Sequence, residues 1–235
     1  MVEFGDNLSW TYVMGGLARD YTNTPSARDE RLAQWLDVAE RGGMPLDPRL
    51  WREAAISSSY PACMAVKAAA EQGADVEGRY LRLVREGLMC FRRKLDTTEA
   101  LVEEARRGRL DVERFRIDLG SHAIVEAFGA DLEETRADER IAFPSVVFDG
   151  GAGAYGFSTY DELRAAAIAA GAVPVGEPPP QVLEALRRFG TMATAEVAAV
   201  CELPGPRAPA ELWRLASEWQ VRPVPVLTGE LWQSA

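Results

Sequence analysis

The segment from Arg140 to Gly156 limits the fold of this chain most, because a short apolar run lies between a proline and a glycine-rich turn. Residues 145–148 predict a buried strand, Asp-Gly-Gly at 149–151 predicts a turn, and residues 154–157 predict a returning antiparallel strand. Proline has no N–H to donate to a sheet, so Pro144 is expected at the first residue of its strand. The segment therefore predicts a β-hairpin, with residues 143–148 and 154–157 in one sheet.

A helix is predicted directly after the hairpin, over residues 158–170. Two overlapping capping-box patterns begin at Ser158 and Thr159, and the alanine-rich stretch that follows favours a helix. Leu163 and Ile168 are expected among the core residues where this helix packs across the sheet. Hairpin and helix are therefore predicted to form one packed unit.

The first half of the chain predicts one strand and then mainly helices. Residues 8–14 alternate apolar and polar side chains and two glycines follow at 15–16, which predicts a strand over residues 8–16. Residues 26–42 predict an amphipathic helix. Residues 60–128 are helical by pattern throughout. Five basic residues lie mostly outside the apolar stripe at residues 81–91, which indicates a solvated face: Arg82, Arg85, Arg92, Arg93 and Lys94. The acidic residues at 131–139 are interpreted as a solvated linker.

The strongest break in the sequence is Gly-Glu-Pro-Pro-Pro at 176–180, which is typical of a stiff extended spacer. We therefore predict two domains, residues 1–175 and residues 181–235. The sequence of the second domain predicts three short helices and a hairpin, an order that resembles a winged helix. Its five arginines are outnumbered by six glutamates, so the pattern favours a protein-contact module over DNA binding. Three tryptophans are expected in its core: Trp213, Trp219 and Trp232.

Composition excludes several classes of partner. The chain has 235 residues, of which 47% are hydrophobic and 26% charged, and a formal net charge of -10. That charge opposes attraction to nucleic acid or to an anionic membrane. No apolar run approaches the roughly 18 residues of a membrane span, and the N-terminus lacks the features of a signal peptide. A cytoplasmic protein with no nucleic-acid or membrane partner is expected.

The three cysteines, Cys63, Cys90 and Cys201, are far apart and form no Cys-x-x-Cys pair. Each is expected to be a small buried residue on its own helix, which predicts no dithiol chemistry. Cys63 follows Pro61 at a predicted helix start, where unsatisfied N–H groups favour a thiolate, so it is the candidate reactive thiol. No metal site or cofactor is predicted. The sole histidine, His122, has no acidic or nucleophilic pattern near it in sequence.

Four motifs in order resemble the DsbA-like branch of the thioredoxin superfamily, the group of DSBA-family or FrnE-like dithiol-disulfide isomerases, to which a bacterial protease-adaptor branch is related. They lie at residues 10–17, 59–69, 110–115 and 143–148. The resemblance covers about residues 8–171. It implies an α/β (α+β) fold, a thioredoxin-like sheet with an α-helical insertion at 60–128. It also implies that Phe143-Pro144 is a cis peptide bond and that both residues contact an extended protein or peptide substrate.

The chain departs from that family at its N-terminus. Family members begin with a strand and a helix that carries Cys-x-x-Cys, and such a unit needs about twenty residues. Seven residues precede Leu8, so both redox cysteines are absent from this sequence. The loss of that strand would leave two unpaired inner sheet edges. Three alternatives would account for these unpaired edges: a rearranged sheet, a strand supplied by a partner or another copy, or a start codon upstream of Met1.

Two functional interpretations follow. The first is a thiol-disulfide oxidoreductase or isomerase whose nucleophile lies outside this sequence. The second is a non-catalytic adaptor or chaperone-like protein that binds protein partners on the same scaffold. A glutathione-dependent isomerase of the kappa class ranks last, because it needs a serine or cysteine on the absent helix.

Overall fold

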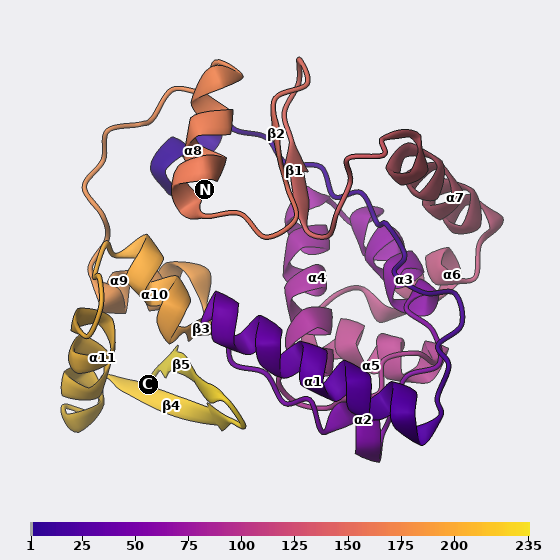
Figure 1. Cartoon of the computed structure of the whole chain (residues 1–235), viewed down its shortest axis with the longest axis horizontal. Helices are drawn as coiled ribbons and strands as arrows, with labels where there is room; N and C mark the ends of the chain where they lie inside the picture. Colours follow the sequence, from indigo (N-terminus) through magenta and orange to yellow (C-terminus); the bar gives the residue numbers. More distant parts are fainter. Residues whose placement is uncertain (1) are drawn as a thin grey trace. The chain divides into compact units, whose positions relative to one another are not determined.

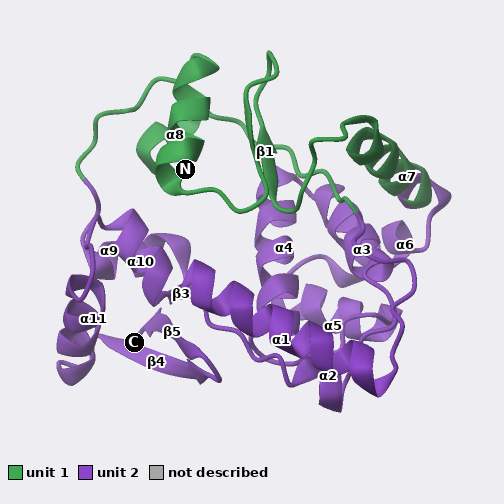
Figure 2. Ribbon diagram, in the orientation of Figure 1, with its two compact units in different colours: residues 1–15, 125–178 green, residues 16–124, 179–235 purple. Residues whose placement is uncertain are grey.

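The computed structural model describes residues 2–235, which fall into two compact units (Figure 2). Unit 1 combines residues 1–15 with 125–178, and unit 2 combines residues 16–124 with 179–235. Each unit therefore joins two stretches that are distant in sequence. The predicted domains, residues 1–175 and 181–235, are a different division and stay a prediction.

Unit 1 contains the predicted hairpin. Strands β1 (Ser145–Val147) and β2 (Gly153–Tyr155) pair antiparallel, with Ser145 opposite Tyr155 and Val147 opposite Gly153. Gly150 and Gly151 have φ angles of 89° and 90°, which the turn requires and L side chains rarely adopt. The Phe143-Pro144 peptide bond is cis, as the family resemblance implied. The hairpin prediction is confirmed, with shorter strands than expected.

Helix α8 (Tyr160–Ala169) follows β2 and packs against it. Of the two capping boxes, the structure forms the one from Thr159: the Thr159 hydroxyl accepts from the Glu162 N–H, and the Glu162 carboxylate accepts from the Thr159 N–H at 2.7 Å. Ala167 is fully buried, Leu163 is half-buried and Ile168 is 43% exposed. The prediction for Ile168 is wrong because successive helical residues point about 100° apart and Ala167 occupies the buried face.

The N-terminal segment of unit 1 is not the predicted strand. After the 3-10 segment η1 (Val2–Asn7), residues 8–16 follow an irregular course without sheet partners. The Met14 N–H donates instead to the Asp131 carboxylate at 2.8 Å. An alternating pattern yields a strand only where an edge is present to satisfy its backbone groups. Within unit 1, the Glu3 carbonyl accepts from Val175 and Phe4 is fully buried.

Most of unit 2 is a helical body (Figure 1). Its helices are α1 (Pro25–Gly42), α2 (Leu50–Glu53), α3 (Tyr60–Ala70), α4 (Ala74–Met89), α5 (Thr98–Arg107) and α6 (Val112–Leu119). Tyr80 and Phe115 are fully buried with ring centroids 5.1 Å apart, and the Tyr80 hydroxyl donates to the Leu101 carbonyl at 2.9 Å. The helical character predicted for residues 60–128 is confirmed.

Helix α7 (His122–Ala137) begins in unit 2 and continues into unit 1. It extends through much of the acidic stretch that was interpreted as a solvated linker, so that interpretation is wrong for residues 131–137. Asp131 is 8% exposed. Its hydrogen bond with the Met14 N–H explains why this acidic residue is buried on a helix instead of solvated in a linker.

The C-terminal part of unit 2 has the predicted winged-helix-like order. It contains α9 (Val182–Phe189), β3 (Met192–Ala193), α10 (Thr194–Val200), α11 (Arg207–Ser217), β4 (Val221–Val226) and β5 (Gly229–Ser234). The strands form an antiparallel sheet in the order β3-β5-β4, and β3 was not predicted. Trp232 is fully buried, whereas Trp213 is 52% and Trp219 is 86% exposed. Trp213 contacts Trp232 edge-on at 4.9 Å, but Trp219 is not a core residue.

Two groups of contacts inside unit 2 join this C-terminal part to the helical body. The Arg82 guanidinium pairs with the Glu196 carboxylate through both Nη atoms and donates to the Thr191 carbonyl at 3.0 Å. The Thr228 hydroxyl accepts from the Leu46 N–H at 2.7 Å and donates to the Leu46 carbonyl at 3.1 Å. The prediction that Arg82 lies on a solvated face is therefore wrong.

Candidate functional site

The hairpin entrance in unit 1 is the site that the sequence singled out. Phe143 is 49% exposed and Pro144 is also exposed. The Phe143 ring lies on the backbone of Gly15, where an added Cβ would be 2.1 Å from the ring Cζ. Around it, the Ala142 carbonyl accepts from the Gly156 N–H at 3.0 Å and from the Ser145 hydroxyl. The entrance is thus a well-connected loop that presents an exposed aromatic ring.

The hairpin also has open sheet edges. Among residues 2–235, β1 and β2 pair only with each other, so each strand keeps one edge without a sheet partner. Such an edge can bind an extended peptide by main-chain hydrogen bonds. Beside it, Arg140 pairs with Asp138 at 2.8 Å and lies 4.9 Å from the Tyr155 ring centroid. The arginine hydrogen bonds lower the pKa of the Asp138 carboxyl, so this pair is ionised at neutral pH.

The three thiols are placed separately, as predicted. Cys63 lies in α3, whereas Cys90 and Cys201 follow the last residues of α4 and α10. None forms a disulfide in the part of the chain described, and Cys201 is buried while the other two are half-buried. Burial raises the pKa of the Cys90 thiol to about 11 and also raises that of Cys201. Cys90 and Cys201 are therefore neutral thiols near pH 7, which disfavours nucleophilic chemistry at either.

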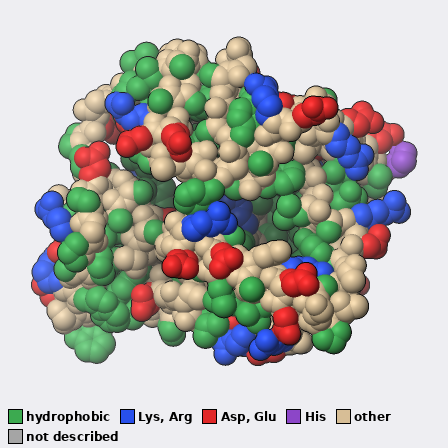
Figure 3. Space-filling view, viewed as in Figure 1, with side chains coloured by type: hydrophobic (Ala, Val, Ile, Leu, Met, Phe, Trp, Pro, Cys, Tyr) green, Lys and Arg blue, Asp and Glu red, His purple; other side chains and the backbone are tan. Residues whose placement is uncertain are grey.

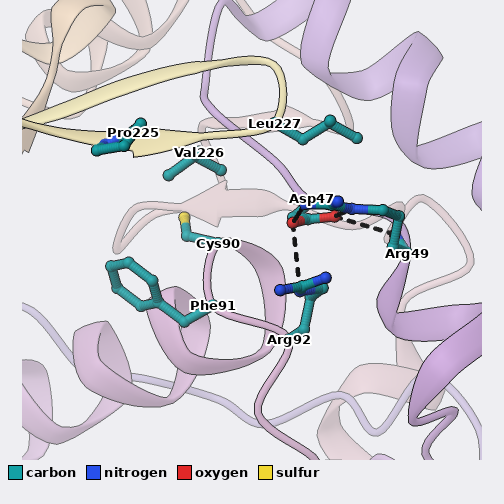
Figure 4. A pocket seen from close by; sticks show the side chains of 8 residues that line it. All are labelled: Asp47, Arg49, Cys90, Phe91, Arg92, Pro225, Val226 and Leu227. Atoms are coloured by element: carbon teal, nitrogen blue, oxygen red, sulfur yellow. Dashed lines mark hydrogen bonds and ion pairs between the residues drawn. The ribbon is translucent and has the colours of Figure 1, made fainter.

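A cavity of about 360 Å³ in unit 2 lies beside Cys90 and was missed by the sequence reading (Figure 4). The tip of the β4–β5 hairpin lies on one side of it, and Cys90, Phe91 and Arg92 lie on the other. Eight residues line it: Asp47, Arg49, Cys90, Phe91, Arg92, Pro225, Val226 and Leu227. The signal that could have found it is the acidic residue in Leu-Asp-Pro-Arg at 46–49, because a carboxylate that becomes buried needs a cationic partner.

The surface has no single dominant charge on the face shown in Figure 3, where basic and acidic side chains are interspersed. Among residues 2–235, no group of His, Cys, Asp and Glu has the arrangement of a metal site. No helix in that range is long and apolar enough to cross a bilayer. His122 is exposed at the first residue of α7.

Comparison with known proteins gives two kinds of match. A family model described as thioredoxin matches residues 2–162. A ClpXP adapter protein SpxH from Halalkalibacterium halodurans is 28% identical, over 99% of this chain and 80% of the relative. Proteins of the same name from Bacillus subtilis and Shouchella clausii are 28% and 33% identical, over 85% and 74% of this chain and 70% and 60% of the relatives.

A solved structure supports the fold. A crystal structure from Nitrosomonas europaea, described as a candidate protein disulfide isomerase, superposes with a TM-score of 0.58 at 18% identity. The match covers 66% of this chain and 78% of the other. At that identity the likeness concerns the thioredoxin-like fold and not the activity.

Proposed function

The chain belongs to the thioredoxin family, and from this premise we propose that it is a non-catalytic adaptor that binds protein partners and acts with ClpXP. One observation carries the proposal: the similarity to a ClpXP adapter protein runs over 99% of the chain, well beyond the residues that match the thioredoxin model. The C-terminal part is therefore included in the likeness. The other interpretation, a thiol-disulfide oxidoreductase, is supported only by a fold-level match at 18% identity.

The thiols support the adaptor more than the oxidoreductase. A dithiol enzyme needs two cysteines that can bridge and at least one thiol with a lowered pKa. In this chain burial raises the pKa of both Cys90 and Cys201. That leaves Cys63 as the candidate thiol, and its helix α3 contains no second cysteine.

Exposed aromatic side chains are the second support, because protein-binding surfaces are enriched in them. In unit 1, Phe143 and Phe157 are 49% and 60% exposed. In unit 2, Trp213 and Trp219 are 52% and 86% exposed. We keep Phe143 and Pro144 as the proposed contact residues for a protein partner, and binding of a partner segment or another copy as the way the hairpin edges are covered.

The proposal also includes the predicted division at residues 176–180 and a cytoplasmic location, where a ClpXP partner would be met. A C-terminal domain that folds independently would let the adaptor hold one protein on each part. The domain division and the location are therefore expected only if the chain is an adaptor.

The test is direct binding of the purified chain to purified ClpX and ClpXP of the same organism, measured by biolayer interferometry. We expect saturable binding, and ClpXP-dependent degradation of at least one protein that accumulates both in cells lacking this chain and in cells lacking ClpX. The matched control is the variant Cys63→Ser, which removes the candidate reactive thiol and should bind and deliver as well as the wild type. Reduction of insulin by the wild-type chain, lost in Cys63→Ser, would contradict the proposal.

A further inference from the structure

We propose that the cavity beside Cys90 in unit 2 binds the C-terminal carboxylate of a partner protein or peptide whose last side chain is apolar. This inference rests on the proposed adaptor function and assigns part of its partner recognition. It is carried by two guanidiniums that a buried carboxylate holds in place, next to an apolar wall formed by the β4–β5 hairpin (Figure 4).

Asp47 positions the two cations. Its side chain is 5% exposed, and Arg49 donates to both carboxylate oxygens, from Nε at 2.8 Å and from Nη2 at 2.5 Å. Arg92 Nε lies 3.3 Å from the same carboxylate. Hydrogen bonding from Arg49 lowers the pKa of Asp47, so the carboxylate is ionised at neutral pH. A paired, buried anion of this kind fixes both guanidiniums before any ligand arrives.

The cations retain capacity for one more anion. The lining residues carry two arginines and one aspartate, and Glu53 pairs with Arg92 from outside the lining. Arg92 Nη1 donates at 2.8 Å to Glu53, which is 53% exposed and so well screened. Within residues 2–235, Nη1 of Arg49 and Nη2 of Arg92 make no hydrogen bond. Each unused donor can give one hydrogen bond to a carboxylate, which has two acceptor oxygens.

The backbone at Arg92 brings this side chain to the cavity. Arg92 has a φ of 52°, the left-handed conformation that a non-glycine residue rarely adopts. The N–H groups on either side, from Phe91 and Arg93, donate to the last turn of α4 at 3.0 and 2.8 Å. Arg93 then pairs with the buried Glu104, whereas Arg92 lines the cavity. A left-handed residue just after a helix end is common, and here it turns the chain so that the Arg92 side chain lines the cavity.

The opposite wall is apolar and fixed. It consists of Pro225, Val226 and Leu227 at the tip of the β4–β5 hairpin, and Leu227 is 52% exposed. The two hydrogen bonds between Thr228 and Leu46 hold this tip against the loop that carries Asp47. Proline contributes no N–H, so this wall favours an apolar side chain over a second polar group.

Size and charge select the ligand. A volume of about 360 Å³ is at the small end of ligand pockets, which suits the last one or two residues of a chain and not a folded element. A carboxylate carries one charge, so Asp47 repels it less than it would repel a doubly charged phosphate.

The test uses fluorescence anisotropy with the hexapeptide Gly-Ser-Gly-Ser-Ala-Leu, labelled at its N-terminus, as the free acid and as the C-terminal amide. We expect the full chain to bind the free acid at least about tenfold more tightly than the amide, and Arg92→Gln to lose about tenfold for the free acid alone. A peptide that ends in serine should bind more weakly than the one that ends in leucine. The matched control, Arg106→Gln, removes an exposed arginine of the same unit and should change nothing.

Equal binding of acid and amide, no binding of either, or an unchanged affinity in a folded Arg92→Gln variant would overturn the inference. If circular dichroism shows that Arg92→Gln is unfolded, Arg49→Gln takes its place with the same expected loss. Displacement by inorganic phosphate as effective as by acetyl-leucine would reassign the cavity to simple anions and overturn the peptide assignment. If the peptide results fail while ClpXP binding persists, only this inference fails. Loss of ClpXP binding with intact peptide selectivity would instead contradict the proposed function.

Discussion

The two compact units bury different kinds of side chain. Unit 2 contains most of the large side chains that are fully buried, among them Tyr80, Phe115 and Trp232. Phe4 is the one member of that group in unit 1 within residues 2–235, where Phe128 is 4% exposed and the small residues Ala154 and Ala167 are also buried. Burial of apolar area is the main stabilising contribution to a fold. Unit 2 should therefore supply most of the free energy of unfolding.

The sheets of the two units also differ, because the sheet of unit 2 has longer strands and more strand pairs than that of unit 1. In unit 2, β4 and β5 are paired over six residues each, and β5 also pairs with β3. In unit 1, β1 and β2 have three residues each and leave open edges, and exposed Phe143 lies at their entrance. The comparison teaches that unit 1 has exposed apolar surface beside unpaired strand edges, while unit 2 buries several large aromatic residues and also exposes Trp213 and Trp219.

The largest expected effect comes from the core of unit 2. Phe115→Ala should lower the free energy of unfolding by about 3–5 kcal/mol, because it removes a fully buried ring and leaves a cavity. Ile117→Ala is the matched control on the same helix, since Ile117 is 73% exposed, and should change stability by less than about 0.5 kcal/mol. Urea unfolding followed by circular dichroism measures both. Similar values for the two variants would show that Phe115 is not part of a packed core in unit 2.

A smaller effect is expected where the C-terminal part joins the helical body. Arg82→Met should destabilise by about 2 kcal/mol, because it removes charge-assisted hydrogen bonds to Glu196 and Thr191 and leaves Glu196 without this partner. Hydrogen exchange should show the loss of protection first in residues 182–234. Arg106→Met, at an exposed pair, serves as the comparison. Uniform loss of protection throughout unit 2 would show that the two parts unfold together.

The pH dependence of stability should also differ between the units. Hydrogen bonds from Arg49 lower the pKa of the Asp47 carboxyl below the ordinary value of an aspartate. A lowered folded pKa gives stability that is present above the unfolded pKa and is lost as pH falls through the folded value. Asp47→Asn should therefore flatten the decline of stability below about pH 4. Asp138→Asn in unit 1 should have less effect because Asp138 pairs at the surface. If the free energy of unfolding falls equally steeply below about pH 4 in the wild type and in Asp47→Asn, the prediction is wrong.

The features that could be predicted from the sequence are those that local residues determine. The hairpin depends on Pro144 and two turn glycines, and α8 depends on its Thr159 cap, so neighbouring residues suffice. The cysteine placement followed from the helix pattern. These predictions needed no knowledge of distant contacts.

The features that could not be predicted depend on residues far apart in the chain. Residues 8–16 have a strand pattern, but whether they pair depends on an edge that another segment must provide. The pairing of Arg82 with Glu196 spans 114 positions, and Asp47 meets Arg92 only after folding. Exposed Trp219 could not be distinguished from buried Trp232 by residue type alone.

The smallest expected change in stability tests the candidate contact surface of unit 1. In Gly15→Ala the new Cβ would lie 2.1 Å from the Phe143 ring, so the ring must move. The ring is the far end of a side chain that is 49% exposed, and its displacement should therefore cost less than about 1 kcal/mol. Affinity for a protein partner held at Phe143 and Pro144 should nevertheless fall, because the partner meets a displaced ring. Gly42→Ala is the control, since an added Cβ there has no neighbour within 4 Å. Thermal unfolding and partner binding are measured for both variants. Unchanged affinity in Gly15→Ala, with the ring shown by NMR to have moved, would remove Phe143 from the partner surface and leave unit 2 as the place to look for it.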